Sequence, residues 1–361
     1  MTVKLSAAGW LQLFTQSRTP NQFLTRMFTL KPGGAHNGKT VTIDIKRFGE
    51  QVAVAVKRFH GSNMNDFDLF TTKEFTPPHY SEGFPADVAE LLERQAGEDP
   101  YSAAYAEYTG KLVTKLMQGY NVINDKIVRS VELQASQILQ TGQLNLIDQN
   151  GNVTYELDFK PKATHFPTVG VPWATVATAD PLGDLEALAD VIRADGKVDP
   201  DRVIMGSNAL KNFLKNQEVK DQLDNKGMTI GQIAPEMQDS GAKFYGFIHI
   251  GAYEFQIWTY PETYEHPQTG ATTKYIGADN VVMLSTRTRL DMTFAGEPTI
   301  GSDPRLSGLM PGRMTDRQAG FDVTPNLYCT PDGRQIIGDL YSNPLLVPVQ
   351  IDGFGCVKTA V

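Results

Sequence analysis

The sequence predicts an α+β fold in which one rod-like helix lies across a β-sheet. Residues 101–141 carry apolar side chains at helical spacing over an unusual length, which indicates that helix. Residues 167–289 mix short helical stretches with short strands, which is typical of an α+β module. Strand periodicity also occurs at residues 41–59 and returns after residue 320. With 361 residues, the chain is long enough for about two domains.

Residues 1–38 carry scattered apolar side chains without long periodicity and are expected to form an arm. The stretch GGAHNGKT at 33–40 matches the phosphate-loop pattern, which requires a strand before it and a helix after it. Only the short stretch FTLKP precedes it, and strand periodicity follows it, so we disfavour a nucleotide-binding enzyme. We expect Gly33, Gly34 and Gly38 to let the chain swing into a β-ribbon.

The β-ribbon is predicted over residues 39–60. Alternating apolar residues mark its two strands on either side of a turn near residues 48–51: Val41, Ile43, Ile45, Val52, Val54 and Val56. Basic residues concentrate on the same ribbon: Lys39, Lys46, Arg47, Lys57 and Arg58. Such charges usually lie on a solvated strand face, with contact to nucleic acid or to an acidic neighbouring subunit as the alternatives.

The predicted ribbon has little hydrophobic support of its own. The segment after it ends in FTPPHYSEG, where Phe75 precedes Pro77-Pro78, and proline confines this region to an edge strand or a loop. An isolated two-stranded hairpin is marginally stable in water. The ribbon therefore needs a supporting surface, either from this chain or from a neighbour.

Proline and glycine bound the helices that follow. Pro85 is expected to open a helix over PADVAELLERQAG, and Pro100 a much longer one that ends at Gly142. The apolar stripe of the long helix stays on one face: Tyr105, Tyr108, Leu112, Leu116, Tyr120, Ile123, Ile127, Val131, Ala135 and Ile138. A coiled coil is the alternative, but the stripe has no heptad, which favours a rod lying across a sheet.

Further elements follow the long helix. A hairpin is expected over QLNLID and NVTYELDF, then a helix at 182–196, the strand RVIMG and a helix at 208–223 capped by Ser207. Four strands come next, in KFYGFIHI, YEFQIWTY, TTKYIG and NVVMLSTRT. The tail is expected to be loop-rich from Asp291 to Gly320 and then to return as strands in FDVTPNLYC, RQIIGDLY and LLVPVQI.

No motif predicts enzyme chemistry, a cofactor or a metal. The six histidines stand far apart without metal-ligand spacing, and no catalytic Cys–His arrangement accompanies Cys329 or Cys356. An acidic cluster near one helix start does not match a calcium loop and is better explained by stabilisation of the helix dipole: Asp180, Asp184, Glu186 and Asp190.

The overall charge and hydropathy exclude two further classes. The net charge of −8 argues against tight wrapping of nucleic acid, which requires clustered Lys and Arg. The N-terminal apolar patch is too short for a signal peptide, and no run is long enough to span a membrane. We expect a protein that is synthesised in the cytoplasm and has no contact with a membrane.

The order of these features resembles one known family. The stretches that carry the resemblance are VTIDIKRFGEQVAVAVKRF at 41–59, FTPPHYSEG at 75–83, EDP before the long helix, IGADNVVMLSTRT at 276–288 and NPLLVPVQIDGF at 343–354. Together they are similar to the major capsid proteins of lambda-type tailed bacteriophages, the E family, whose fold is the Hong Kong ninety-seven type. The resemblance covers nearly the whole chain.

The resemblance implies a division of the chain. Residues 1–38 would be the N-terminal arm and 39–80 an extended loop over an adjacent subunit. Residues 81–166 would form a peripheral domain with its spine helix at 101–141, and 167–289 an axial domain. Residues 290–361 would return to complete the peripheral domain.

The resemblance also implies partners. Subunits would assemble as pentamers and hexamers into an icosahedral head of the virion, with a separate scaffolding protein, a portal protein and an optional decoration protein. Assembly would take place in the host cytoplasm without covalent cross-links, and the shell would enclose double-stranded DNA without reading its sequence. An encapsulin-like nanocompartment is the alternative function.

Overall fold

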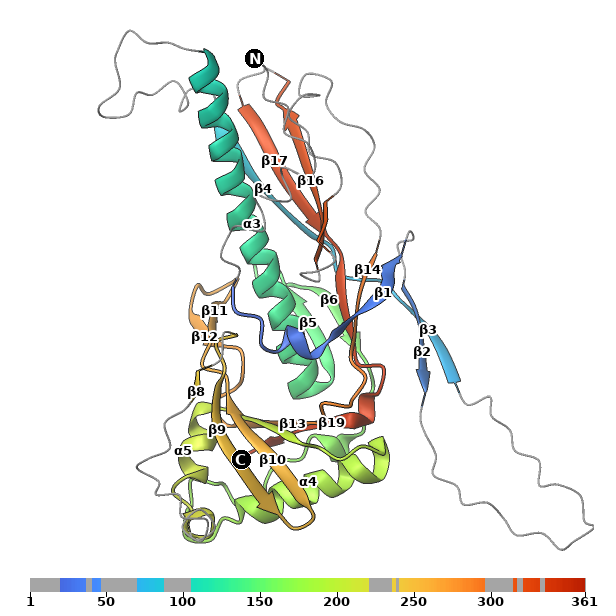
Figure 1. Cartoon of the computed structure of the whole chain (residues 1–361), viewed down its shortest axis with the longest axis vertical. Helices are drawn as coiled ribbons and strands as arrows, with labels where there is room; N and C mark the ends of the chain where they lie inside the picture. The colour runs from blue at the N-terminus through green and yellow to red at the C-terminus, as the bar shows by residue number, and fades with distance from the viewer. Residues whose placement is uncertain are drawn as a thin grey trace, which may run out of the picture.

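The computed structural model describes residues 20–36, 41–46, 70–87, 105–220, 236–237, 240–295, 314–316, 321–331 and 335–360. In this part of the chain a long helix runs beside a β-sheet at one end, and a sheet covered by two helices lies at the other end (Figure 1). A two-stranded ribbon extends sideways from the middle.

The long helix α3 spans Tyr105–Thr141. At ~1.5 Å per residue, its 37 residues make a rod of about 55 Å. It ends at Gly142, whose φ of 66° lies in the left-handed region, and the Gly142 amide donates to the Ile138 carbonyl at 2.8 Å. This glycine stop agrees with the end that the sequence predicts.

An antiparallel four-stranded sheet lies along α3, in the order β15-β16-β17-β4. Its strands are β15 (Met314–Asp316), β16 (Phe321–Cys329), β17 (Gln335–Ser342) and β4 (Tyr80–Asp87). Pro85 lies inside β4, so the prediction that it opens a helix is wrong. An edge strand accepts proline because one side of its backbone needs no ladder hydrogen bond.

Phe84 of β4 fills the contact between α3 and the sheet. Its ring meets Tyr120 edge-on, with centroids 5.3 Å apart. A Cβ on Gly119 of α3 would lie 2.4 Å from this ring, and one on Gly338 of β17 would lie 2.9 Å from it. The two glycines therefore make room for the ring between helix and strand.

A second, three-stranded sheet has the order β1-β14-β18. Its strands are β1 (Thr29–His36), β14 (Asp291–Ala295) and β18 (Pro344–Val347). Two predictions are wrong here. Gly33 and Gly34 lie within β1, which runs parallel to β14 with an irregularity between Leu30 and Ala35. The start of the expected loop-rich tail is the fully buried strand β14.

The third sheet has six strands in the order β19-β13-β7-β10-β9-β8. These are β19 (Phe354–Lys358), β13 (Asn280–Leu284), β7 (Arg202–Met205), β10 (Tyr253–Thr259), β9 (Lys243–Ile250) and β8 (Glu236–Met237). The helices α4 (Pro181–Gly196) and α5 (Ser207–Phe213) lie beside it (Figure 1).

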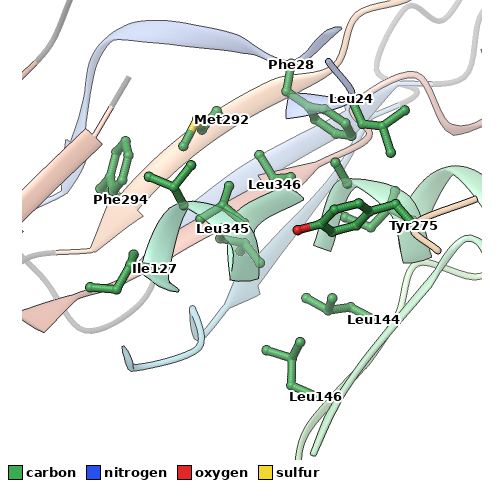
Figure 2. Packing of buried hydrophobic residues seen from close by; sticks show 14 of the residues in the cluster. Leu24, Phe28, Ile127, Leu144, Leu146, Tyr275, Met292, Phe294, Leu345 and Leu346 are labelled. Carbon is green, nitrogen blue, oxygen red and sulfur yellow. The ribbon is translucent and has the colours of Figure 1, made fainter. Parts of the chain in front are cut away.

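The six-stranded sheet separates two hydrophobic cores. In β13, Val282 and Leu284 belong to the core around α3, whereas Val281 and Met283 belong to the core under α4 and α5. The alternation follows from the period of two in a strand. Figure 2 shows the first core, where Leu24 and Phe28 lie near Leu346. One sheet is therefore the common wall of both cores.

Two expectations for this region are corrected. Strand β19, within the predicted return segment 290–361, pairs with β13 of the predicted axial domain, so that segment serves both regions. Ser207 is the first residue of α5 rather than its cap, because Gly206 holds the cap position without a side-chain hydrogen bond. The helix ends at Phe213, and the predicted helix 208–223 is interrupted at 214–216 before the chain is helical again at 217–220.

Three hairpins complete the described fold. The predicted hairpin of β5 (Gln143–Ile147) and β6 (Val153–Asp158) is confirmed. A second consists of β11 (Thr263–Glu265) and β12 (Thr272–Lys274). The third is the projecting ribbon of β2 (Val41–Lys46) and β3 (Phe70–Phe75). Short 3-10 turns occur at η1 (Thr25–Met27), η2 (Ala163–His165) and η5 (Ile351–Gly353).

Candidate functional site

The ribbon of β2 and β3 is the first candidate for an interaction site. The strands pair antiparallel, with Val41 opposite Phe75 and Lys46 opposite Phe70. Figure 1 shows the pair extending away from the body. By strand alternation, Val41, Ile43 and Ile45 share one face of β2, and the register places Phe75, Lys73 and Thr71 of β3 opposite them.

The sequence prediction paired β2 with a different strand. The structure gives β2 the partner β3, and Lys46 pairs with Phe70, about 20 residues further along the chain than a tight hairpin would allow. Several predicted ribbon residues lie outside the described part of the chain: Lys39, Arg47, Val52, Val54, Val56, Lys57 and Arg58.

The base of the ribbon is packed within the chain. The Phe75 side chain is buried, with its ring 5.7 Å from that of Phe159. Pro77 and Pro78 are buried too, and the Tyr155 hydroxyl donates to the Thr76 carbonyl at 2.6 Å. Phe75, Pro77 and Pro78 were predicted to meet another subunit. That prediction is corrected, because all three side chains are already buried within the chain.

The apolar stripe of α3 lies in the first core. Its described members are at most 4% exposed: Leu112, Leu116, Tyr120, Ile123, Ile127, Val131, Ala135 and Ile138. The side chains of Tyr105 and Tyr108 lie outside the described part. The stripe residues lack polar chemistry, apart from the Tyr120 hydroxyl, which donates to the Asn326 carbonyl at 2.7 Å. Burial raises the pKa of Tyr120 well above its usual range.

A second buried line on α3 carries polar side chains that the sequence reasoning missed. Gln140 accepts from the Gly277 amide at 2.9 Å and donates to the Tyr275 carbonyl at 2.8 Å. Ser136 donates to the same carbonyl. The sequence did contain a signal for this line: Val128, Glu132 and Ser136 follow one another at spacings of four, which places them on one face of the helix. A helix that packs against neighbours on two sides buries this face as well as the apolar stripe.

Glu132 is the most enclosed charged group of this line, with 0% exposure. One carboxylate oxygen accepts from the Leu24 amide at 2.8 Å. The other accepts from the Thr25 amide at 2.9 Å and the Thr25 hydroxyl at 2.6 Å. Burial raises the pKa of Glu132, and the hydrogen bonds from Thr25, Leu24 and Tyr260 oppose this by favouring the carboxylate.

A second polar cluster joins the connector after β6 to α4. His165 is fully buried, with Nδ1 at 2.9 Å from the Phe354 carbonyl and Nε2 at 3.2 Å from Asp195 Oδ2. Lys162 Nζ lies 2.6 Å from the other oxygen of Asp195. The hydrogen bond from Lys162, followed by that from His165, lowers the pKa of Asp195.

The acidic cluster at the start of α4 has structural roles. Asp180 caps the helix by accepting from the Gly183 amide at 2.8 Å. Asp184 accepts from the Trp173 indole at 2.8 Å, and its pKa is raised chiefly by burial. The described residues contain no group of three or more His, Cys, Asp or Glu side chains suited to a metal ion.

Two further properties bear on the class of protein. Among the described residues, no helix is long and apolar enough to cross a membrane. Neither Cys329 nor Cys356 is in a disulfide, and burial raises the pKa of the Cys356 thiol to about 12. A thiol with such a pKa stays protonated near neutral pH, which does not suit a nucleophile.

The fold of the chain is similar to those of solved prophage and phage-related proteins. One is described as a capsid protein of a prophage of E. coli CFT073, with 17% identity, a TM-score of 0.56 and 97% of each chain covered. Another is a phage-related protein from Bordetella bronchiseptica RB50, with 12% identity, a TM-score of 0.51, and 97% of this chain and 96% of that chain covered. The fold is thus the Hong Kong ninety-seven type of capsid protein, as predicted.

The sequence pattern of the phage major capsid protein E family matches residues 8–359. The chain belongs to this family. It is a capsid shell protein of the virion that assembles with copies of itself, and it is not an enzyme. These predictions are confirmed.

Two other comparisons add no function. No curated protein matches the chain. The SrpI encapsulin from Synechococcus elongatus PCC 7942 matches with 10% identity and a TM-score of 0.44, over 96% of this chain and 91% of that chain. A likeness of this size carries no argument for a nanocompartment.

Proposed function

We propose that this shell protein assembles as pentamers and hexamers into an icosahedral phage head, and that the ribbon β2–β3 meets a second copy of the chain. The observation that supports this is the ribbon's geometry: it extends away from the body, and among the described strands β2 and β3 pair with each other alone. A two-stranded ribbon is marginal alone, so a neighbouring subunit supplies the missing support.

In this proposal the regions keep the roles that the resemblance implies. The first part of the arm and the loop of residues 39–80 reach neighbours, although residues 21–36 of the predicted arm 1–38 and residues 75–80 belong to the body. The region around α3 is the peripheral domain, and the six-stranded sheet with α4 and α5 is the axial domain. Strand β19 belongs to the axial sheet.

Further partners belong to the same proposal. A separate scaffolding protein, a portal protein and an optional decoration protein act during assembly in the host cytoplasm, and subunits join without covalent cross-links. The shell encloses double-stranded DNA without specific contacts. A net charge of −8 agrees with this, because close binding of phosphates needs an excess of Lys and Arg.

Two neighbouring residues of β2 test the role of the ribbon. Ile43→Asp places a charge on the face of β2 that carries Val41 and Ile45, and Thr42→Asp places the same charge on the opposite face of the same strand. We expect Ile43→Asp to abolish closed particles in negative-stain microscopy and sedimentation, and Thr42→Asp to leave most of them. Both free subunits should melt within about 2 °C of wild type, because Thr42 and Ile43 pair beyond the buried base of the ribbon at Phe75.

Trypsin provides an independent measurement. Sites at Lys46, Arg47, Lys57 and Arg58 should be cut in the free subunit and protected in the particle, because an element with few buried contacts opens readily. Full assembly of Ile43→Asp, or equal protection of these sites in the free subunit, would contradict a ribbon that contacts a neighbour.

A further inference from the structure

We propose that Glu132 is a positioning residue for assembly: its carboxylate holds the segment from Asn21 to Phe28, from which both the N-terminal arm and the strand leading to the ribbon depart. The inference rests on the proposed role of the ribbon. Glu132 would thus fix the position from which the arm and the ribbon begin, although it lies 107 residues after Thr25 in the sequence.

The first observation is the chemistry of the contact. Segment 21–28 contains the 3-10 turn η1, whose cap residue Leu24 provides no side-chain hydrogen bond. The first amides of a helical turn have no partner within the turn. Glu132 accepts the Leu24 amide on one oxygen and the Thr25 amide on the other, so a carboxylate from α3 caps η1. Hydrogen bonds to a charged acceptor are the strong ones.

The second observation is that the contact is enclosed on all sides. Glu132 and Leu24 are 0% exposed, and Thr25 is 5% exposed. Tyr260 covers the carboxylate from the side of β10, where its hydroxyl also lies 3.3 Å from the Asn21 carbonyl. Asn21 donates to Glu262 at 2.7 Å. The segment is therefore held between α3 and the end of the six-stranded sheet.

Ring packing reinforces the same placement. The Phe23 ring lies 5.5 Å from Trp258 and 5.5 Å from Tyr260, centroid to centroid. Phe28, at the other end of the segment, is 4% exposed and lies with Leu24 in the first core (Figure 2). Strand β1 starts at the next residue, Thr29, whose amide donates to the Leu290 carbonyl at 2.7 Å.

The position of η1 also affects the ribbon, because η1, β1 and β2 follow one another closely along the chain. Thr29 is the fourth residue after Thr25, and β1 is followed within a few residues by β2. A change in the position of η1 therefore shifts the start of β1 and the direction in which the ribbon leaves the body. Unpaired apolar contacts alone would allow such a shift, whereas paired amide-to-carboxylate bonds fix one register.

The test uses the full-length chain and the isosteric variant Glu132→Gln. An amide at this position turns its NH₂ group toward one of the two backbone amides, so one strong hydrogen bond becomes a repulsive contact. We expect trypsin cleavage after the exposed Arg26 to become roughly tenfold faster or more, relative to cleavage after Lys211 in α5. The yield of closed particles should fall at least about fivefold.

Ser136→Ala is the matched control. Ser136 is 2% exposed, lies one helical turn after Glu132 and donates to the Tyr275 carbonyl rather than to the segment. It should leave the Arg26 cleavage ratio and the particle yield near the wild-type values. If Ser136→Ala changes both as much as Glu132→Gln does, the effect is general destabilisation and the proposal is wrong.

A second variant keeps the proposal testable if Glu132→Gln does not fold. Thr25→Val removes only the hydroxyl donor and keeps the amide, so it should raise the Arg26 cleavage ratio by a smaller factor. In the double variant Glu132→Gln/Thr25→Val, the second substitution should raise the Arg26 cleavage ratio little further, because the carboxylate that accepts from the Thr25 hydroxyl is already lost. Unchanged Arg26 cleavage in both single variants would show that Glu132 does not hold the segment.

The two proposals fail in different ways. Fast Arg26 cleavage with normal particle yield would refute the positioning role and leave the ribbon's role intact. Normal assembly of Ile43→Asp would refute the ribbon's role, and Arg26 cleavage in Glu132→Gln would still report whether the carboxylate holds η1.

Discussion

The region around α3 and the region around α4 are built in opposite ways from the same chain. The α3 core collects segments from the whole sequence: η1, β4, β14, β16, β17 and β18 all contribute side chains to it. The core under α4 and α5 is drawn almost entirely from residues 169–283, with Val357 of β19 as the addition from the tail. The α3 core therefore depends on contacts between segments far apart in the sequence, whereas the core under α4 and α5 is formed mostly by segments close together in the sequence.

The difference has a physical consequence at the six-stranded sheet. Because β7, β13 and β19 point alternate side chains into each core, neither core can lose this sheet without exposing the other. We therefore expect the two regions to unfold together, although their chain organisation differs.

The largest expected effect comes from a charge in the α3 core. Leu116→Asp places a carboxylate where the native side chain is apolar and 0% exposed. The free energy of unfolding should fall by about 4 kcal/mol or more. Denaturant titration followed by far-ultraviolet circular dichroism measures the loss.

The same variant tests whether the sheet couples the regions. Trp173 is 1% exposed in the second core, so its fluorescence, with Trp10 and Trp258 replaced by Phe, reports on that core. Both transitions should shift together. A Trp173 transition that stays at the wild-type midpoint would mean that the regions are independent. Lys126→Asp, at a site 56% exposed beside Glu82, is the control and should cost less than about 1 kcal/mol.

The comparison also explains how much the sequence could predict. In the local region, α4, β7, β9, β10 and β13 were all expected, because each shows its own periodicity between turn residues. Strands β14 and β19 were missed. Asp291–Ala295 is buried on both sides and therefore has no alternation, and Phe354–Lys358 contains glycine and cysteine, which carry little strand preference.

The candidate site was predictable only in part. The apolar face of β2 follows from alternation, but its partner β3 does not, because pairing across a long connection leaves no local signal. Phe75 was assigned to an interface because the sequence cannot reveal Phe159 beside it. Glu132 was passed over because a charged residue on a helix usually lies in water, and its donors are remote in sequence.

A smaller effect is expected at the connector between the two regions, where Asp195 meets Lys162 and His165. Asp195→Asn should lower the free energy of unfolding at pH 7 by about 1–2 kcal/mol, because the pair is partly buried, with the Asp195 side chain 27% exposed. Asp199→Asn is the control. Asp199 is 66% exposed and pairs with Arg193, so its loss should cost less than about 0.5 kcal/mol.

The pH dependence of Asp195→Asn has a definite sign. Since the folded-state pKa of Asp195 is lowered, its contribution is present above the ordinary aspartate pKa of about 3.9 and is lost as the pH falls through the lower folded value. The gap between wild type and variant should be full at pH 7 and should close near pH 2. A gap that persists in acid would mean that packing, rather than charge, holds the connector to α4.

The smallest effect concerns a single hydroxyl that ties α3 to the tail of the chain. Tyr120→Phe removes the donor to the Asn326 carbonyl of β16 and keeps the ring against Phe84. The free energy of unfolding should fall by about 1 kcal/mol, since Tyr120 is 0% exposed and water cannot replace the lost donor. Tyr155→Phe removes a hydrogen bond of similar length, 2.6 Å to the Thr76 carbonyl, at a site that solvent can reach, and should cost about half as much. Chemical denaturation of both variants under one set of conditions gives the ratio. Equal losses would mean that burial does not set the value of these hydrogen bonds, and that distant segments are held to α3 by ring packing alone.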